Sequence, residues 1–317
     1  MEKKELAQLL ALDDFSPVYE KADAVRRENV GDEVHIRAII EFSNICGRKC
    51  RYCGLNSTNK SVIRYRMSPE EILDTARQAI DAGYRTIVLQ SGEDPCFHKE
   101  SLGQVVKEIK KAGAAVTLSC GELTFEELEY LRDCGADRYL LKHETADPEL
   151  YKQLHPCGTL EERVTCLENI YRLGYETGSG FMIGLPGQTL ETIADDLLLL
   201  QKLHCAMAGI GPFIPHPDTP LGKEKEGSPE LTKRAVALAR LLLPKANLPV
   251  TTSLGVINQK EKENAFACGA NVIMKKVTPD PYKEAYEIYP AKLEKTDIKK
   301  DRKLLEEQIR GLGRIPL

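Results

Sequence analysis

A repeated alternation of apolar strands and amphipathic helices constrains the fold of this chain more than any other feature. Helical stretches at residues 3–11 and 16–28 come first. Eight segments that read as strands follow: Ile36–Phe42, Arg85–Gln90, Ala114–Ser119, Arg138–Lys142, Glu176–Met182, Met207–Phe213, Pro249–Ser253 and Asn271–Met274. Several are short, continuous apolar runs, which is typical of parallel strands buried on both faces. Eight such strands alternating with helices predict an α/β fold, a closed (β/α)8 barrel of the TIM type.

The predicted barrel occupies most of the chain. The first 35 residues form a short helical segment, the barrel covers residues 36–290, and residues 291–317 form a charged tail with a helix docked outside the barrel. No stretch rich in Pro, Gly or Ser divides these parts, so we expect one domain over residues 1–317. In a barrel of this kind, functional side chains lie at the C-terminal ends of the strands.

Composition excludes several classes of protein. The 317 residues carry 44 Lys plus Arg against 48 Asp plus Glu, and this balance does not predict a basic surface for nucleic acid. No run of about 18 apolar residues is present, which argues against a membrane span. The charged N-terminus has no apolar signal segment, so the expected location is the cytoplasm.

A cluster of three cysteines follows the first predicted strand. Cys46, Cys50 and Cys53 have the spacing C-x3-C-x2-C, with Gly, Arg and Lys between them, as expected of an exposed loop. A structural zinc site needs four protein ligands, and no second Cys/His pair with zinc spacing follows. Three core cysteines without a ligand are the other alternative. Three thiolates suit a [4Fe–4S] cluster that leaves one iron open for a ligand.

This motif resembles that of the radical S-adenosylmethionine (SAM) enzymes, a family of β/α barrels. The resemblance implies that Cys46, Cys50 and Cys53 are the metal ligands and catalytic centre. The open iron would bind SAM, and reductive cleavage of SAM would yield a 5′-deoxyadenosyl radical. Tyr52, just before the third cysteine, would pack near the adenine. An iron–sulfur scaffold or redox sensor without radical chemistry is an alternative of another class.

Other strand ends match the cofactor contacts of that family. The segment Gln90-Ser91-Gly92-Glu93 resembles the part that contacts the methionine ammonium of SAM. Glu144 would accept hydrogen bonds from the ribose or the ammonium. Arg163 would hold the SAM carboxylate, because its planar fork suits that group; a surface helix charge is the alternative. Met182 and Ile210 would line the adenosyl pocket.

Longer segments such as GIGPFIPHPDTPL (209–221) and GADRYLLKHETADP (135–148) resemble the HydE family of [FeFe]-hydrogenase maturases. The resemblance implies a role in assembly of the hydrogenase diiron site, on a small or organometallic substrate supplied by sister maturases. The electron donor would be a ferredoxin or flavodoxin. The alternative is a paralogue, or a mutase similar to methylornithine synthase, acting on another small substrate.

The same resemblance assigns a substrate chamber inside the barrel. Its lining residues would be Thr117, Arg138, Lys142, Thr251, Thr252, Met274, Tyr286 and Tyr289. For the tyrosines, packing of an amphipathic C-terminal segment is the alternative. Two departures from the family pattern stand out. Lys142 replaces the usual Arg and loses its bidentate fork. The stretch Ala291–Leu305 lacks the second cysteine triad of many relatives, so we expect a single cluster.

Overall fold

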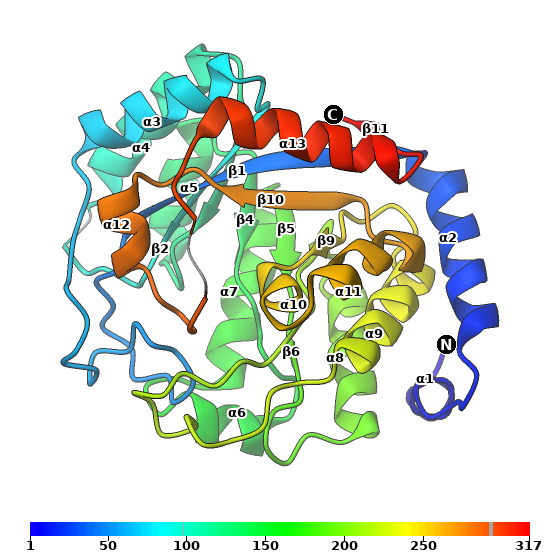
Figure 1. The fold of residues 1–317 in the computed structure, drawn as a ribbon. Helices are drawn as coiled ribbons and strands as arrows, with labels where there is room; N and C mark the ends of the chain where they lie inside the picture. The colour runs from blue at the N-terminus through cyan, green and yellow to red at the C-terminus, as the bar shows by residue number, and fades with distance from the viewer. Residues whose placement is uncertain (97, 292–293) are drawn as a thin grey trace.

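A computed structural model describes residues 1–96, 98–291 and 294–317. The order of elements is helix, helix, then strands and helices in alternation (Figure 1). The strands are β1 (Glu33–Ser43), β2 (Thr86–Ser91), β3 (Ala115–Ser119), β4 (Arg138–Leu140), β5 (Glu176–Ser179), β6 (Met182–Ile183), β7 (Met207–Ala208), β8 (Gly211–Pro212), β9 (Pro249–Val250), β10 (Val272–Lys276) and β11 (Ile315–Pro316). The α-helices are α1 (Lys3–Leu10), α2 (Ser16–Val30), α3 (Pro69–Asp81), α4 (Lys99–Lys111), α5 (Phe125–Asp133), α6 (Pro148–Leu154), α7 (Leu160–Arg172), α8 (Leu190–Lys202), α9 (Pro229–Leu242), α10 (Thr252–Ile257), α11 (Gln259–Asn264), α12 (Asp280–Ala285) and α13 (Ile298–Gly311), and a 3₁₀ helix spans Ala265–Cys268.

Eight strands form the wall of a parallel barrel, as predicted. Their order is β7-β5-β4-β3-β2-β1-β10-β9, and every neighbouring pair is parallel. The two edge strands meet through Asn247, just before β9. Its backbone N–H donates to the Ala206 carbonyl (2.8 Å), and its carbonyl accepts from the Ala208 N–H (3.1 Å). This seam nearly closes the sheet into the expected (β/α)8 barrel.

Four predicted strands are clearly shorter than the sequence indicated, and the first of them, predicted at 138–142, ends at Leu140. The predicted strand at 176–182 breaks after Ser179, and the one at 207–213 breaks after Ala208. Their second halves, β6 and β8, pair with each other as a separate two-stranded sheet. The break lies where Gly180 approaches Gly209 so closely that a Cβ on Gly180 would sit 2.1 Å from the Gly209 carbonyl oxygen. The predicted strand at 249–253 ends at Val250, because Thr252 already begins α10.

The barrel wall separates an apolar layer from a polar interior. On β1, Ile36, Ala38 and Ile40 are at most 2% exposed and pack in the main core between strands and helices. The alternating residues Arg37 and Glu41 are equally buried but face the other way. An α/β barrel core is ordinarily filled by branched apolar side chains. Charged residues at these positions therefore indicate that the barrel interior binds a ligand.

Helix boundaries follow the sequence signals. Ser68 and Thr124 form capping boxes at the starts of α3 and α5, with side chains that accept from Glu71 N–H and Glu127 N–H. The predicted tail helix is α13, which packs against β11 and α3 (Figure 1). The tail also adds β11, which pairs with the start of β1 and was not predicted. Residues 292 and 293 of the predicted tail lie outside the described residues.

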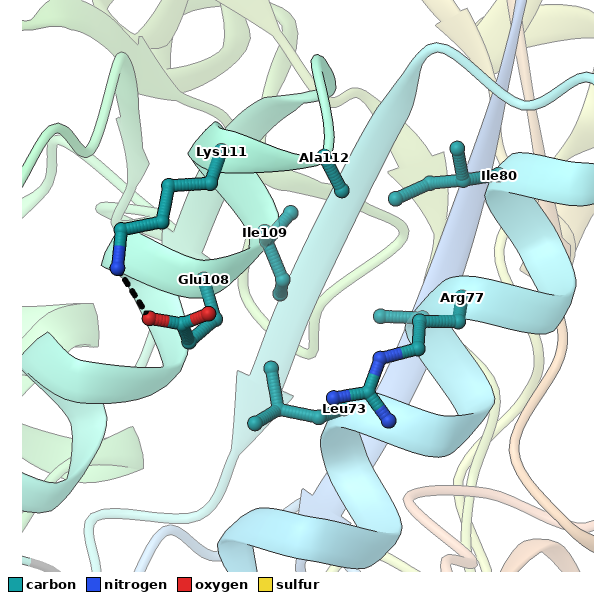
Figure 2. A pocket seen from close by; sticks show the side chains of 8 residues that line it. Leu73, Arg77, Ile80, Glu108, Ile109, Lys111 and Ala112 are labelled. Atoms are coloured by element: carbon teal, nitrogen blue, oxygen red, sulfur yellow. Dashed lines mark hydrogen bonds and ion pairs between the residues drawn. The ribbon is translucent and has the colours of Figure 1, made fainter.

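Two surface features lie away from the strand ends. A hollow between α3 and α4 has an apolar floor edged by the ion pair of Lys111 with Glu108 (Figure 2). It belongs to the outer helical layer and so is separate from the barrel interior. Within the described part of the chain, no helix combines the length and apolar character needed to cross a bilayer.

Candidate active site

The cysteine loop follows β1 and is held by the end of β2. The Gly47 N–H donates to the Glu93 carbonyl (2.9 Å), and the Gly92 N–H donates to the Ser43 carbonyl (2.9 Å). A Cβ on Gly92 would lie 2.4 Å from the Ile45 carbonyl oxygen and 2.8 Å from the Cys46 Cβ. Only glycine permits this approach, so the Gly-Glu segment found in the sequence supports the cysteine loop directly.

Cys46, Cys50 and Cys53 lie close enough for their charges to act on one another. Three thiolates are the ligand set of a [4Fe–4S] cluster with one open iron, in which each thiolate would bind a different iron. Burial raises the pKa of all three thiols, and repulsion from the neighbouring thiolates adds to the effect at Cys50 and Cys53; the two causes together bring the pKa of Cys53 to about 12. A bound iron centre offsets that cost because it supplies positive charge.

Four charged side chains form a closed network beside this loop. Arg48 pairs with Glu93 (Nε–Oε2 2.5 Å) and Glu122 (Nη2–Oε2 2.7 Å). Arg163 pairs with Glu122 (Nε–Oε1 2.6 Å) and lies 3.9 Å from Glu93. Arg163 also donates to the Tyr151 hydroxyl and the Lys142 carbonyl, both at 3.1 Å. We call Arg48, Glu93, Glu122 and Arg163 the rim network.

The rim network decides between the two interpretations of Arg163 and adds two residues to the candidate site. Arg163 is only 8% exposed, so the surface-charge interpretation of this arginine is wrong. Sequence reasoning missed Arg48 and Glu122. A signal was available for Glu122, since Gly121-Glu122 follows the third strand just as Gly92-Glu93 follows the second. Gly121 has a φ of 81°, and a Cβ there would lie 1.9 Å from the Glu93 Cγ.

Glu144 occupies an unusual backbone position just beyond β4. Its φ is 64°, a left-handed conformation that is rare for residues other than glycine. Its N–H donates to the Gly180 carbonyl (3.0 Å), and its carbonyl accepts from Met182 N–H (3.2 Å). The Glu144 carboxylate pairs with Lys142 (3.0 Å). The two residues that the sequence assigned to different ligands, cofactor and substrate, are thus in contact.

Two of the three predicted adenosyl-pocket residues lie together. Met182 belongs to a small apolar cluster with Leu150, Leu154, Leu185 and Phe213, and Tyr52 packs against it. The Tyr52 hydroxyl forms a hydrogen bond with His155 Nε2 (3.0 Å). Ile210 is 1% exposed and belongs to the main hydrophobic core, not to this cluster.

Several predicted chamber residues lie inside the barrel. Thr117 and Arg138 are neighbours on β3 and β4. Arg138 stands at the start of β4, away from the strand's C-terminal end, and pairs with Glu176 (2.6 Å). Met274 is the register partner of Arg37, whose guanidinium reaches Met207 Sδ on β7 (3.0 Å).

These interior polar groups are short of partners. Thr117 Oγ1, Arg138 Nη1 and Arg37 Nε are buried and have no hydrogen-bond partner among the residues that the structure describes. Arg37, which sequence reasoning did not single out, is 2% exposed. The sequence signal that could have identified Arg37 is the presence of an arginine within an apolar strand segment. An unpaired buried donor is costly, so three of them together favour an anionic or polar ligand.

The remaining chamber residues form the upper part of the interior. Tyr286 follows α12, and its hydroxyl accepts from Gln90 Nε2 on β2 (3.2 Å). Tyr289 interacts with Ser253, whose hydroxyl lies 3.2 Å from Thr251 Oγ1. Gln90, predicted as a cofactor contact, thus lies with a predicted substrate residue. Thr252 lies on α10 instead of a strand, in the position described above.

Comparison with known proteins agrees with this geometry. Residues 40–200 match the Radical SAM superfamily, and residues 210–308 match the Biotin and Thiamin Synthesis associated domain. The chain belongs to the radical SAM superfamily. The cysteine loop, the Gly92-Glu93 support and all four residues of the rim network lie within the first of these two matches.

Individual members of the superfamily are also similar. The chain is 55% identical to the [FeFe] hydrogenase maturase subunit HydE of Thermotoga maritima over 87% of its own length and 79% of that protein's. It is 30% identical to 3-methylornithine synthase of Methanosarcina acetivorans over 98% of its own length and 89% of that protein's. A crystal structure of methylornithine synthase superposes with a TM-score of 0.87 at 25% identity, covering all of this chain and 94% of that one.

Proposed function

We propose that this radical SAM enzyme acts as a HydE-type maturase in assembly of the diiron site of [FeFe]-hydrogenase. The observation that carries the proposal is the 55% identity to HydE over most of both chains, together with two buried arginines inside the barrel that each keep one nitrogen without a partner in the described chain. A bound cluster supplies the single electron that cleaves SAM. Every other task falls to side chains of this chain.

Cys46, Cys50 and Cys53 would hold the cluster. Residues at the strand ends would hold SAM: Tyr52 and Met182 flank an apolar cluster suited to adenine, and Glu144 offers a carboxylate to the ammonium or ribose. Arg163 would face the SAM carboxylate, while Glu93 and Glu122 hold its guanidinium in a fixed plane. The contacts of Gln90, Ser91 and Gly92 with SAM belong to the same proposal.

The substrate would lie deeper in the barrel. Arg37, Thr117 and Arg138 offer three donors without partners in the described chain, which fits an anionic small molecule or organometallic complex. Tyr286, buried beside Gln90, and the half-buried Tyr289, beside Ser253, would close the chamber near the strand ends.

A second candidate function is a mutase similar to methylornithine synthase. The TM-score of 0.87 over the whole chain favours it, because chamber shape follows the fold. The lower identity, 30% against 55%, favours the maturase. Purified enzyme should decide between them: it should support maturation of a hydrogenase when added to the other maturases, and a Cys50→Ala variant should not. SAM cleavage without maturation would favour the second candidate.

The number of clusters and the partners complete the proposal. With cysteines only at 46, 50 and 53 in ligand spacing, reconstituted protein should bind about four irons per chain. We also propose that sister maturases exchange substrate with this enzyme and that a ferredoxin or flavodoxin supplies its electron. Iron and sulfide analysis tests the first point, and reduction assays with each donor test the last.

A further inference from the structure

A buried histidine and a buried aspartate stand directly behind Glu144 and have no part in the function proposed so far. His143, the residue before Glu144, and Asp196 on α8 are both 0% exposed. His143 Nε2 lies 3.4 Å from Asp196 Oδ1. Neither His143 Nε2 nor Asp196 Oδ2 has a hydrogen-bond partner among the described residues.

Hydrogen-bond accounting fixes the protons of this pair. The Ser179 hydroxyl donates to the Leu141 carbonyl (3.0 Å), so its oxygen accepts from the His143 backbone N–H (3.2 Å) and from Nδ1 (2.9 Å). The imidazole proton is then on Nδ1, and Nε2 presents a lone pair to Asp196. Two acceptors facing each other in a dry interior would repel, so a proton must lie between them.

The surroundings decide which group brings that proton. The charged side chains with the largest effect on Asp196 are acidic: Asp195 on α8, Glu144 beyond β4 and Asp147 before α6. Those that act on His143 are Glu144, Lys142 and Arg163. Burial raises the pKa of Asp196 well above its usual range and lowers that of His143 to about 3. Both groups are therefore uncharged near neutral pH.

The pair holds the turn on both sides of Glu144. Asp196 Oδ1 accepts from the Ala146 N–H (2.5 Å), two residues after Glu144. His143, one residue before it, is tied to β5 through Ser179. Between these two attachments Glu144 keeps its left-handed backbone, which is unfavourable for a residue other than glycine.

We propose that Asp196 is a buried carboxylic acid that donates its proton to His143 Nε2, and that this neutral pair positions Glu144 for the cofactor. The pair consists of positioning residues, since neither touches the proposed SAM site except through Glu144. The proposal rests on the assignment of Glu144 to SAM. It extends the cofactor site into α8, a helix for which the sequence offered no function.

The experiment is SAM titration calorimetry on cluster-loaded variants. Asp196→Leu and His143→Phe should each weaken SAM binding about tenfold, as is usual when a partner that orients a ligating group is lost. Asp196→Asn should stay within about threefold of wild type, because its amide still accepts from Ala146 and can donate to Nε2 after a small rotation. Asp195→Asn, the exposed neighbour that pairs with Lys3, is the matched control and should bind like wild type.

Three outcomes distinguish the parts of the proposal. If Glu144→Gln binds SAM as wild type does, the assignment of Glu144 fails. If Glu144→Gln weakens binding while folded His143→Phe and Asp196→Leu do not, the positioning role fails and the cofactor site stands. Infrared difference spectra between wild type and Asp196→Asn report directly whether Asp196 carries a proton. This measurement does not depend on SAM binding. If the band that disappears in Asp196→Asn is that of an ionised carboxylate and not that of a carboxylic acid, the assignment of the proton to Asp196 is wrong.

Discussion

The rim network and the barrel interior handle buried charge in opposite ways. At the rim, two arginines and two glutamates satisfy one another within 2.5–3.9 Å. In the interior, Arg37, Thr117 and Arg138 each keep a buried polar atom without a partner in the described chain. A paired network holds a fixed geometry, whereas an unpaired donor lowers stability until a ligand arrives. The first arrangement suits a resident cofactor, and the second suits a substrate that comes and goes.

The largest effect should come from the loop that the rim network supports. Cys50→Ala removes one of three thiolates, so the variant should lose the cluster and all SAM cleavage while the barrel still folds. Iron analysis and circular dichroism measure the two parts. Cys205→Ala, at a buried cysteine far from the loop, is the control and should keep its iron. A Cys50→Ala protein with four irons would remove the basis for the cofactor site.

Next in size is the loss of a rim arginine. Arg163→Ala should weaken SAM binding roughly a hundredfold and leave iron content unchanged, because a sheltered charge-assisted pair is worth about 2–3 kcal/mol. Arg163→Lys should recover only part of this, since a point charge cannot replace the planar fork. Calorimetry with SAM provides the measurement. Unchanged affinity would limit the rim network to a structural role.

Substitutions of an interior arginine and of a fully paired arginine should have opposite effects on the free energy of unfolding. Arg37→Met removes an under-satisfied charge, so the free energy of unfolding should rise by about 1–2 kcal/mol while processing of the true substrate falls. Arg240→Met is the matched control. Arg240 is equally buried but donates to the Gly269 and Pro244 carbonyls and to Asn271 Oδ1. Its loss should cost about 3 kcal/mol. Urea titration measures both, and similar losses in the two variants would contradict the comparison.

The smallest effect on SAM should arise at Lys142, which lies between the two regions. Its ammonium pairs with Glu144, and its side chain is 29% exposed, so the pair adds little to the position of Glu144. Lys142→Ala should change SAM affinity by no more than about threefold, with a larger loss in maturation of a hydrogenase. Lys142→Arg should keep both activities. Full maturation by the Ala variant would show that Lys142 does not touch the substrate.

Local signals in the sequence were sufficient for the barrel and the cysteine loop. Apolar runs indicated all eight wall strands, and Ser68 and Thr124 marked helix starts, because these features act over a few residues. The breaks after Ser179 and Ala208 depend on contact between Gly180 and Gly209, which come from different strands. The β11 strand depends on pairing with β1 across the length of the chain. Periodicity carries no information about either contact.

The candidate site divides in the same way. The spacing of the cysteines and the Gly92-Glu93 pair could be read directly, since the residues are adjacent in sequence. Arg48 and Glu122 entered the rim network only through side chains from separate loops, and Ile210 belongs to a different apolar cluster from Met182. The proton shared by His143 and Asp196 required hydrogen-bond geometry, which no sequence pattern gives.

The position of β1 in the sheet also bears on the order of events in the cell. β1 delivers the cysteine loop, and its two barrel neighbours are β2, which is next in sequence, and β10, from near the other end of the chain. Contacts between distant segments form late, because the entropy of closing a long loop must be overcome first. The loop's support from Glu93 is local, but its barrel is complete only after synthesis of β10. Iron–sulfur delivery should therefore act on a released, folded protein and not on the nascent chain.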